Sequence, residues 1–302
     1  MKKLIFILIF HLVLLGCAKE EEFPSNFIEG KFVSINEYYQ IVVRDLNWTN
    51  TREFSVGQAW GLPPYSMPLW SSDGSQILYV TKDYGQLNSI MIMDSNGDNK
   101  RQVLQQPGGI FATDWSSDDQ LIAYNANGPG GGFHIMSLDG QEHKILNENG
   151  DYGVTAICLS HDTKKIAVYS DYTNNGELLI IDIASEEVVY SKTEVLGMYS
   201  RPYWSPDDKY IVYNTQTGEE RLGKIVLLNV EDESETIIKE GEGQPVLYRI
   251  FGWTPDGHYI IFVSTPDFAF KAINITTNKE VELNYKSKGA LDYPKGDLFI
   301  FE

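Results

Sequence analysis

Short, continuously apolar segments alternate with polar turns along most of this chain, and the alternation repeats. In LWSSDGSQILYV, residues 69–80, a tryptophan precedes an acidic turn and an apolar run follows it. Four later stretches share this order: DWSSDDQLIAYN, CLSHDTKKIAVYS, YWSPDDKYIVYN and GWTPDGHYIIFVS. The tryptophan positions repeat at intervals of 45, 44, 45 and 49 residues; they are Trp70, Trp115, Leu159, Trp204 and Trp253. This period predicts an array of supersecondary units.

Each unit carries the signals of four short strands, here named a to d. Strand a ends at the tryptophan position, and a Ser-Pro-Asp-Gly type of turn follows, in which aspartate bonds the backbone two residues on. Strands b and c are continuously apolar, as in residues 77–80 and 90–93, whereas strand d mixes polar and apolar residues. Because a sheet with one wet face would alternate, both faces of b and c must be covered. This pattern predicts a β-propeller, and a β-sandwich is the second interpretation.

The two ends of the chain supply the remaining blade. Five full repeats run from about residue 66 to residue 285. The head, GKFVSINEYYQIVVRDLNWTNTREFSV, resembles strands b, c and d, and the tail, GALDYPKGDLFIFE, resembles strands a and b with a turn at residues 294–297. Both ends therefore offer a strand b, and the sequence leaves open which one is used. We expect an all-β, six-bladed β-propeller of four-stranded antiparallel blades over residues 31–302, closed by pairing of the N- and C-terminal segments.

The first residues form an export signal. Two lysines precede a mostly apolar stretch over residues 4–15, which is short for a membrane span. The sequence LLGC at residues 14–17 resembles the bacterial lipobox, which implies cleavage after residue 16 and lipid on the Cys17 thiol. An ordinary signal peptide with a chance cysteine is the alternative. We expect a signal peptide over residues 1–16 and an acidic tether over residues 17–30.

The residues after the cysteine bear on localisation. Ala18 stands where lipoproteins retained in the inner membrane carry aspartate, which implies sorting to the outer membrane. The sequence AKEEE resembles a short export signal of surface lipoproteins and implies display at the cell surface. A solvated acidic tether on the periplasmic face is the alternative.

Composition excludes several classes of partner. The chain has 42 Asp and Glu against 24 Lys and Arg, and the formal net charge of −18 repels nucleic acid. Cys158 lies in an apolar strand as the only cysteine besides Cys17, which predicts a buried, inert thiol without a disulfide or a cysteine zinc site. We expect no cofactor, no nucleic-acid partner and a monomer.

The repeats also permit a resemblance to be named. WSPDDKYIVY and IMIMDSNGDNKRQVL resemble the WD40-like repeat of TolB-type propellers, the PD40 class, over residues 31–302. The resemblance implies the fold but little of the function, because this fold hosts binders, scaffolds, lyases and peptidase gates. The α/β domain of TolB itself and the hydrolase domain of prolyl-oligopeptidase relatives are not recognised in the sequence, so neither a colicin-translocation role nor a peptidase role is carried over.

Catalytic signals are scarce. The sequence has no G-x-S-x-G elbow. DSNGDNK, from residue 94, lacks the glutamate of a calcium loop, and GPGGGF, from residue 128, lacks the Lys-Ser/Thr of a phosphate loop. The histidines fall at different blade positions without a paired spacing, so we expect solvated turn histidines and no metal site; they are His134, His143, His161 and His258.

The loops between strands d and a are the remaining candidates. By fold analogy they gather with the b–c loops at one mouth of the central channel, and here they are rich in aromatic residues and glycine. Aromatic side chains beside arginine favour recognition of sugars, peptides or a protein, although such side chains also pack between blades. The candidate ligand- or partner-binding residues are Tyr65, Asp114, Tyr152, Tyr199, Arg201, Tyr248 and Arg249.

Three functions stay open at this point. The first is a lipid-anchored, non-enzymatic propeller that binds or scaffolds an envelope protein, peptide or glycan. The second is a carbohydrate-active lyase or hydrolase, which needs two carboxylates or a divalent ion in the channel, with Asp114 as the acid we nominate. The third is a structural envelope component in the manner of TolB, which differs from the first mainly in its partner.

Overall fold

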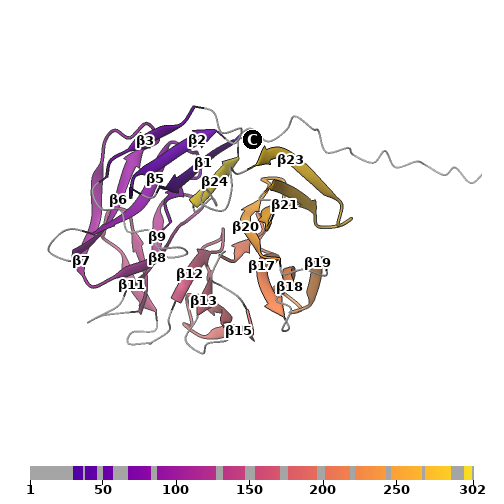
Figure 1. Cartoon of the computed structure of the whole chain (residues 1–302). Coiled ribbons are helices and arrows are strands. Elements are labelled where there is room, and N and C mark those ends of the chain that lie inside the picture. Colours follow the sequence, from indigo (N-terminus) through magenta and orange to yellow (C-terminus); the bar gives the residue numbers. More distant parts are fainter. Residues whose placement is uncertain are drawn as a thin grey trace, which may run out of the picture.

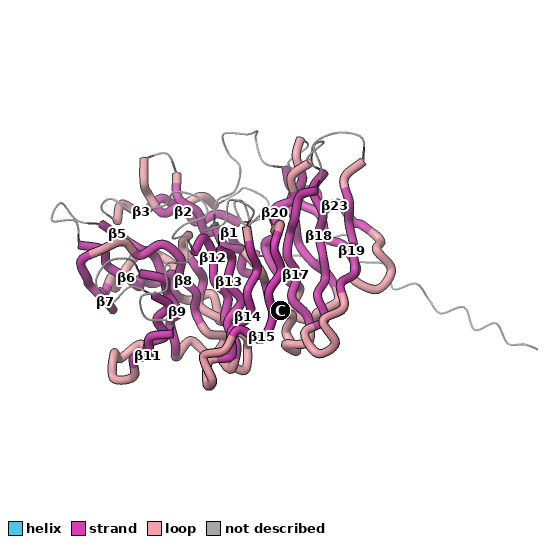
Figure 2. The backbone as a smooth tube through the Cα atoms, turned by 90° about the horizontal axis from the view of Figure 1, so that it is seen from below, coloured by secondary structure: helices cyan, strands magenta, loops and turns pink. Residues whose placement is uncertain are grey.

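The fold is a ring of six four-stranded sheets, as the sequence predicts (Figure 1). The computed structural model describes residues 30–36, 38–45, 50–56, 67–82, 87–126, 132–146, 154–170, 176–195, 201–217, 222–242, 246–266, 269–286 and 296–300. These residues form 24 strands, and neighbouring strands of a sheet are antiparallel. Within these ranges no helix is long and apolar enough to cross a bilayer. Figure 2 shows the ring from a second direction, with strands as its dominant element.

Five sheets are each built from one contiguous stretch, with the first strand next to the ring axis and the fourth at the rim. The first two contain β4 (Leu69–Trp70), β5 (Gln76–Lys82), β6 (Leu87–Asp94) and β7 (Arg101–Pro107), and β8 (Ile110–Trp115), β9 (Leu121–Ala126), β10 (Gly132–Ser137) and β11 (His143–Leu146). The next two contain β12 (Val154–Leu159), β13 (Lys165–Ser170), β14 (Glu177–Asp182) and β15 (Val188–Thr193), and β16 (Tyr203–Trp204), β17 (Tyr210–Thr217), β18 (Leu222–Asn229) and β19 (Glu235–Glu240). The fifth contains β20 (Tyr248–Trp253), β21 (Tyr259–Ser264), β22 (Ala269–Asn274) and β23 (Glu280–Lys286).

The sixth sheet joins the two ends of the chain in the order β24–β1–β2–β3. Its strands are β24 (Gly296–Ile300), β1 (Gly30–Ile35), β2 (Ile41–Asp45) and β3 (Arg52–Phe54). Gly30 pairs with Ile300 and Ser34 pairs with Gly296, and Figure 1 shows the yellow β24 beside the indigo β1. The head therefore supplies strands b, c and d, which decides the question of strand b that the sequence left open.

One expectation about the tail is wrong. Gly296 and Asp297 lie inside β24 rather than in a turn, and β24 is strand a of the closing blade. The physical reason is that β1 is already paired with β2 through the hairpin at residues 36–40, so it occupies the strand b position. The apolar run of the tail then pairs with β1 from the inner side.

Burial follows the predicted gradient across each blade. The interior residues of β5 and β9 are buried, whereas the outermost strands β7 and β15 are mainly exposed or half-buried. The core lies between adjacent blades. Trp70, for example, packs with Val33, Val43 and Tyr79 between the closing blade and the blade that follows it. Each fully buried aliphatic or aromatic side chain of this kind contributes about 1.5–3 kcal/mol.

A repeated hydrogen-bond pattern builds the a–b turns. In the first turn, Ser71 Oγ donates to Asp73 Oδ1 at 2.8 Å, and the same oxygen accepts from the Ser75 N–H at 2.8 Å. Asp118, Asp162, Asp207 and Asp256 repeat both contacts in the other four turns. The recurring aspartate is therefore a turn former, as the repeated Ser-Pro-Asp-Gly type of turn predicts.

The residue after this aspartate has positive φ in every turn, and it links neighbouring blades in two of them. The Asp119 carboxylate accepts from Ser72 N at 2.8 Å and Ser72 Oγ at 2.6 Å in the preceding blade. The Asp208 carboxylate accepts from His161 N and Asp162 N, both at 2.8 Å. The first pair of contacts joins the β4–β5 turn to the β8–β9 turn. The second pair joins the β12–β13 turn to the β16–β17 turn.

Candidate binding site in the central channel

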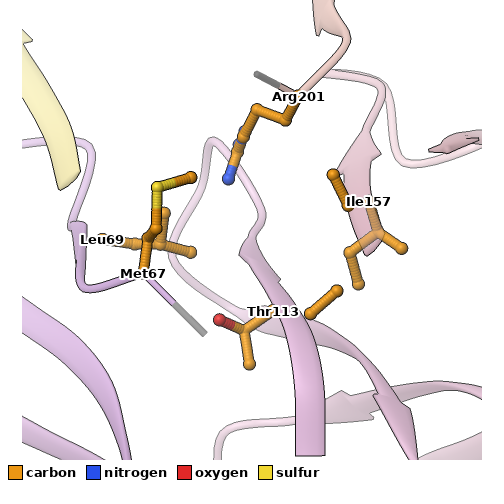
Figure 3. Close-up of a pocket in the computed structure, with 7 residues that line it drawn as sticks. Met67, Leu69, Thr113, Ile157 and Arg201 are labelled. Carbon is orange, nitrogen blue, oxygen red and sulfur yellow. The ribbon is translucent and has the colours of Figure 1, made fainter. Parts of the chain in front are cut away.

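The residues just before each tryptophan position line a pocket on the ring axis. Its walls come from the first strands of four successive blades, namely β4, β8, β12 and the segment before β16 (Figure 3). The space between the protein atoms is about 230 Å³, with open solvent at its mouth included. The lining residues are Met67, Leu69, Ala112, Thr113, Ala156, Ile157 and Arg201.

Asp114 and Arg201 form an ion pair beside this pocket. Arg201 Nη2 donates to Asp114 Oδ1, and both side chains are largely shielded from solvent, with exposed side-chain fractions of 11% and 5%. The other carboxylate oxygen, Oδ2, accepts from the Leu159 N–H at 2.6 Å. The Arg201 guanidinium also lies over the Tyr203 ring, 5.1 Å from its centroid. Charge-assisted hydrogen bonds of this kind fix the orientation of the guanidinium.

This arrangement assigns Asp114 a positioning role. A general acid or base must exchange a proton with substrate, but both oxygens of this carboxylate are engaged by Arg201 and by the backbone of β12. Among the described residues, no group of three or more His, Cys, Asp or Glu side chains is arranged to hold a metal ion.

Cys158 lies next to the ion pair, and its thiol is unreactive. Its thiol is buried, forms no disulfide, and is 3.7 Å from Arg201 Nη2. Burial, with a further contribution from the negative charge of Asp114, raises the pKa of Cys158 to about 12. Because the thiolate is the nucleophilic form, this cysteine has no catalytic reactivity at neutral pH.

Arg249 contacts Met67, one of the residues that line this pocket, from a different blade. It belongs to β20, is only 3% exposed, and its Nη2 lies 2.8 Å from Met67 Sδ. Its guanidinium also lies over the Phe251 ring, 5.4 Å from the centroid. Met67 thus contacts Arg249 and lines the pocket into which Arg201 points (Figure 3).

The other predicted site residues have different outcomes. Tyr248 is buried and packs edge to face on Phe262, with ring centroids 5.7 Å apart, so it belongs to the core between two blades. Tyr65, Tyr152, Tyr199 and Cys17 lie outside the described residues. The sequence analysis missed Met67, Thr113 and Ile157. Their constant offset of two or three residues before a tryptophan position is the signal that identifies such channel-lining residues.

The expectation of solvated, unpaired histidines is wrong for two of them. His134 lies in β10 and is only 4% exposed, and its Nδ1 is 2.9 Å from Nε2 of His143 in β11. The reason is strand register, because His134 pairs with Ile145 and Met136 pairs with His143, which places both imidazoles on one face. His161 and His258 lie in turns, where each binds one aspartate.

Comparison with known proteins agrees with the fold. The family described as TolB beta propeller domain, PD40, matches residues 74–292. The Tol-Pal system protein TolB of Francisella tularensis subsp. tularensis (strain WY96-3418) is 27% identical over 244 residues, which cover 64% of this chain and 54% of that protein. The chain thus spans about half the length of this curated relative. The uncharacterized peptidase YuxL of Bacillus subtilis (strain 168) is 23% identical over 153 residues, 50% of this chain but 22% of that protein.

Solved structures give the same fold at low identity. TolB from Acinetobacter baumannii superposes with a TM-score of 0.63 and 15% identity, covering 91% of this chain and 66% of that one. A chain of the nidogen/laminin complex also gives 0.63, at 11% identity, with 90% and 98% covered. Since the family match extends over most of the blades and the repeat turns carry its pattern, this chain belongs to the TolB β-propeller family.

Proposed function

We propose that this chain is an outer-membrane lipoprotein whose propeller binds an envelope partner at the channel without catalysing a reaction. The observation that carries this proposal is the pair of channel arginines, Arg201 held by Asp114 and Arg249 held against Met67. Both guanidinium groups are oriented before any ligand arrives, which lowers the entropy cost of binding. The channel of the described structure therefore favours recognition over proton transfer.

The chemistry of the site favours a protein segment as ligand. Guanidinium groups bind carboxylate and carbonyl oxygens with defined geometry, and the pocket beside them offers apolar contact through Leu69 and Ile157. A curated relative is named for the Tol-Pal system, which supports a partner in the cell envelope. A peptide or loop that inserts an acidic or amide side chain into the channel fits these features.

The fold also supports a tethered arrangement. β1 begins at Gly30, which pairs with Ile300 at the last position of innermost strand β24. This end of strand a is the one where the a–b turns lie in the other blades. A tether over residues 17–30, attached to membrane through lipid on Cys17, would therefore join the propeller at the side of the a–b turns. The d–a loops would open on the opposite side, toward a partner.

Binding is tested by crosslinking in intact cell envelopes. Arg249→Met retains most of the side-chain volume and removes the charge, and Lys209→Met removes an exposed charge at an a–b turn as a matched control. We expect a specific crosslinked protein to be lost with Arg249→Met and retained with Lys209→Met, with both variants folded by circular dichroism. Equal crosslinking in both would contradict a channel site.

Anchoring is tested separately by fractionation. Cys17→Ala should release the chain from outer membranes, because a diacylated or triacylated cysteine supplies the hydrophobic attachment. A variant that remains in the membrane fraction would contradict lipid anchoring while leaving the binding result unaffected.

A further inference from the structure

The channel pocket contains a buried hydroxyl group that the fold itself does not use. Thr113 lies in β8, is only 6% exposed, and lines the pocket together with residues of β4 and β12. Among the described residues, its Oγ1 is shielded from solvent and has no hydrogen-bond partner. A buried hydroxyl without a partner destabilises a folded chain. Its position in the wall of a pocket therefore indicates that a ligand supplies the partner.

The pocket lies where one link between neighbouring blades is absent. Trp204 Nε1 donates to Cys158 O at 3.0 Å, and Trp253 Nε1 donates to Tyr203 O at 3.1 Å, so each of these indoles joins its blade to the preceding one. The Trp115 indole is buried, but within the described part of the chain its Nε1 has no such acceptor. The innermost strand of the preceding blade, β4, has two residues against six in β8. The first strands of these two blades are thus not joined by an indole, and the pocket lies beside them.

The charge at the pocket wall is balanced. Arg201 lines the pocket on the side opposite Thr113, as Figure 3 shows. Its positive charge is compensated by Asp114 in a shielded ion pair. A carboxylate that entered the pocket would approach the negative Asp114 and would lose hydration without gaining a counterion of its own, whereas a cation would approach Arg201. An uncharged polar group avoids both costs.

A primary amide matches both polar parts of this wall. Its carbonyl oxygen carries partial negative charge and suits the guanidinium side, while its NH₂ group can donate to the Thr113 hydroxyl oxygen. A hydroxyl group has a single polar atom and cannot serve two opposite sides of a pocket. The other lining residues are apolar and suit the methylene groups of asparagine or glutamine; they are Met67, Leu69, Ala112, Ala156 and Ile157.

We propose that Thr113 is a specificity-determining residue that selects the side-chain amide of an asparagine or glutamine in the partner protein. The Arg201–Asp114 pair excludes aspartate and glutamate from the same position. This inference rests on the proposed function, since it names the group that the partner inserts into the channel. The bound amide gives the Thr113 hydroxyl a hydrogen-bond partner, which the described part of the chain does not provide.

The test uses the chain from residue 18 to residue 302, which contains every described strand, and two probes of almost the same shape. These are N-acetyl-asparagine methylamide and N-acetyl-aspartate methylamide. Methyl NMR signals of Met67 and Ile157 report binding, because both side chains line the pocket. Thr113→Val removes the hydroxyl and keeps the shape, whereas Thr113→Ser keeps the hydroxyl. Thr236→Val is the matched control, because Thr236 is an exposed threonine of the rim strand β19.

We expect the asparagine probe to bind at least about tenfold more tightly than the aspartate probe. Thr113→Val should weaken binding of the asparagine probe by about two- to tenfold, whereas Thr113→Ser and Thr236→Val should leave it within about twofold. Thr113→Val should melt no lower than the unchanged chain, because it removes a buried hydroxyl without a partner. A lower melting temperature, equal or tighter binding of the aspartate probe, or no binding of either probe would overturn the proposal.

Crosslinking in cell envelopes separates this inference from the proposed function. A weaker crosslink with Thr113→Val, together with its loss in Arg249→Met, supports both. A crosslink that is retained in Thr113→Val but lost in Arg249→Met overturns only the role of Thr113. If Arg249→Met also retains the crosslink, the proposed channel site fails, whatever the probes show. Tighter binding of N-acetylglucosamine than of the asparagine probe would overturn the protein amide in favour of a glycan.

Discussion

Arg201 and Asp114 are 87 positions apart in the sequence, yet their side chains form a shielded ion pair that spans the blade between them. That intervening blade contributes the Leu159 N–H to the same carboxylate. Three blades are therefore joined at one charged group near the ring axis. If either side chain is replaced by an uncharged one, the remaining charge is left without a partner at a site that is largely shielded from water.

This relationship predicts strong coupling between the two residues. Asp114→Leu or Arg201→Met alone should lower the free energy of unfolding by about 3–5 kcal/mol, because each leaves a buried charge without its partner. The double variant should lose less than the sum of the two, since no lone charge remains. Urea denaturation of the four proteins measures this coupling. Strictly additive losses would show that the pair is not coupled.

The a–b turn at Thr163 offers a stabilising substitution. Thr163 has φ of 57°, a conformation that costs a residue other than glycine about 1–2 kcal/mol. Asp119 and Asp208 occupy the same position in neighbouring blades and accept hydrogen bonds from the preceding turn. Ser117 Oγ already joins the two turns by donating to His161 O at 3.2 Å. Thr163→Asp should relieve the strain, place a carboxylate acceptor beside this contact, and stabilise the chain by about 1–2 kcal/mol.

The matched control is Thr163→Asn, which tolerates the same φ but carries no charge. We expect about half the gain from Asn, as read from thermal melting. A loss of stability in both variants would show that Thr163 makes a contact that outweighs its strain.

Acid should weaken the turns. Hydrogen bonds from Lys209 and Ser205 lower the pKa of Asp207 from 3.8 to about 2. Burial by itself would raise the pKa of Asp162, but the hydrogen bonds from Lys164 and Ser160 have the larger combined effect and lower it to about 2 as well. A lowered pKa in the folded state means that the stabilisation is complete above about pH 4 and is lost as the pH falls toward 2.

The measurement is urea denaturation at several pH values. Since these carboxylates are partly exposed, each should account for at most about 1 kcal/mol. Asp207→Asn keeps an acceptor oxygen for the turn and should flatten the decline between pH 4 and pH 2. An unchanged slope in Asp207→Asn would mean that other carboxyl groups control the acid response.

Cys158 should resist modification while the chain is folded. With a pKa of about 12, the thiolate is scarce at pH 8, and the side chain is also buried. A chain that begins after Cys17 should react with iodoacetamide at least about 100-fold more slowly in buffer than in urea. Rapid labelling in buffer would show that the channel opens near Arg201.

The sequence was a good guide wherever the repeat itself specifies the structure. Turn residues such as Asp73 and apolar strands such as residues 77–80 depend on local patterns, so the blades and their order could be predicted. The tail could not be assigned, because a lone apolar run looks the same as strand a or strand b until its partner is known. The pairing of His134 with His143 depends on the register of two strands, and sequence spacing alone does not give that register.

The channel residues likewise could be predicted only in part. Asp114 and Arg201 could be nominated by position, because both precede a tryptophan anchor. Their mutual contact could not be predicted, since it depends on the diameter of the ring and on the two-blade separation between them. Tyr248 shares the sequence signature of a loop aromatic and yet packs in the core, because the strand β20 begins at that residue.

The pairing of β24 with β1 has a consequence for the order in which the molecule is assembled. Each of the five contiguous blades can form as soon as its own stretch of about 45 residues is available, but the sixth must wait until residues 296–300 meet a strand that was synthesised long before. Until then, β1 exposes an unpaired edge, and a chaperone or a neighbouring copy can pair with it. Ring closure by this late-arriving strand therefore protects the molecule against association through its first one.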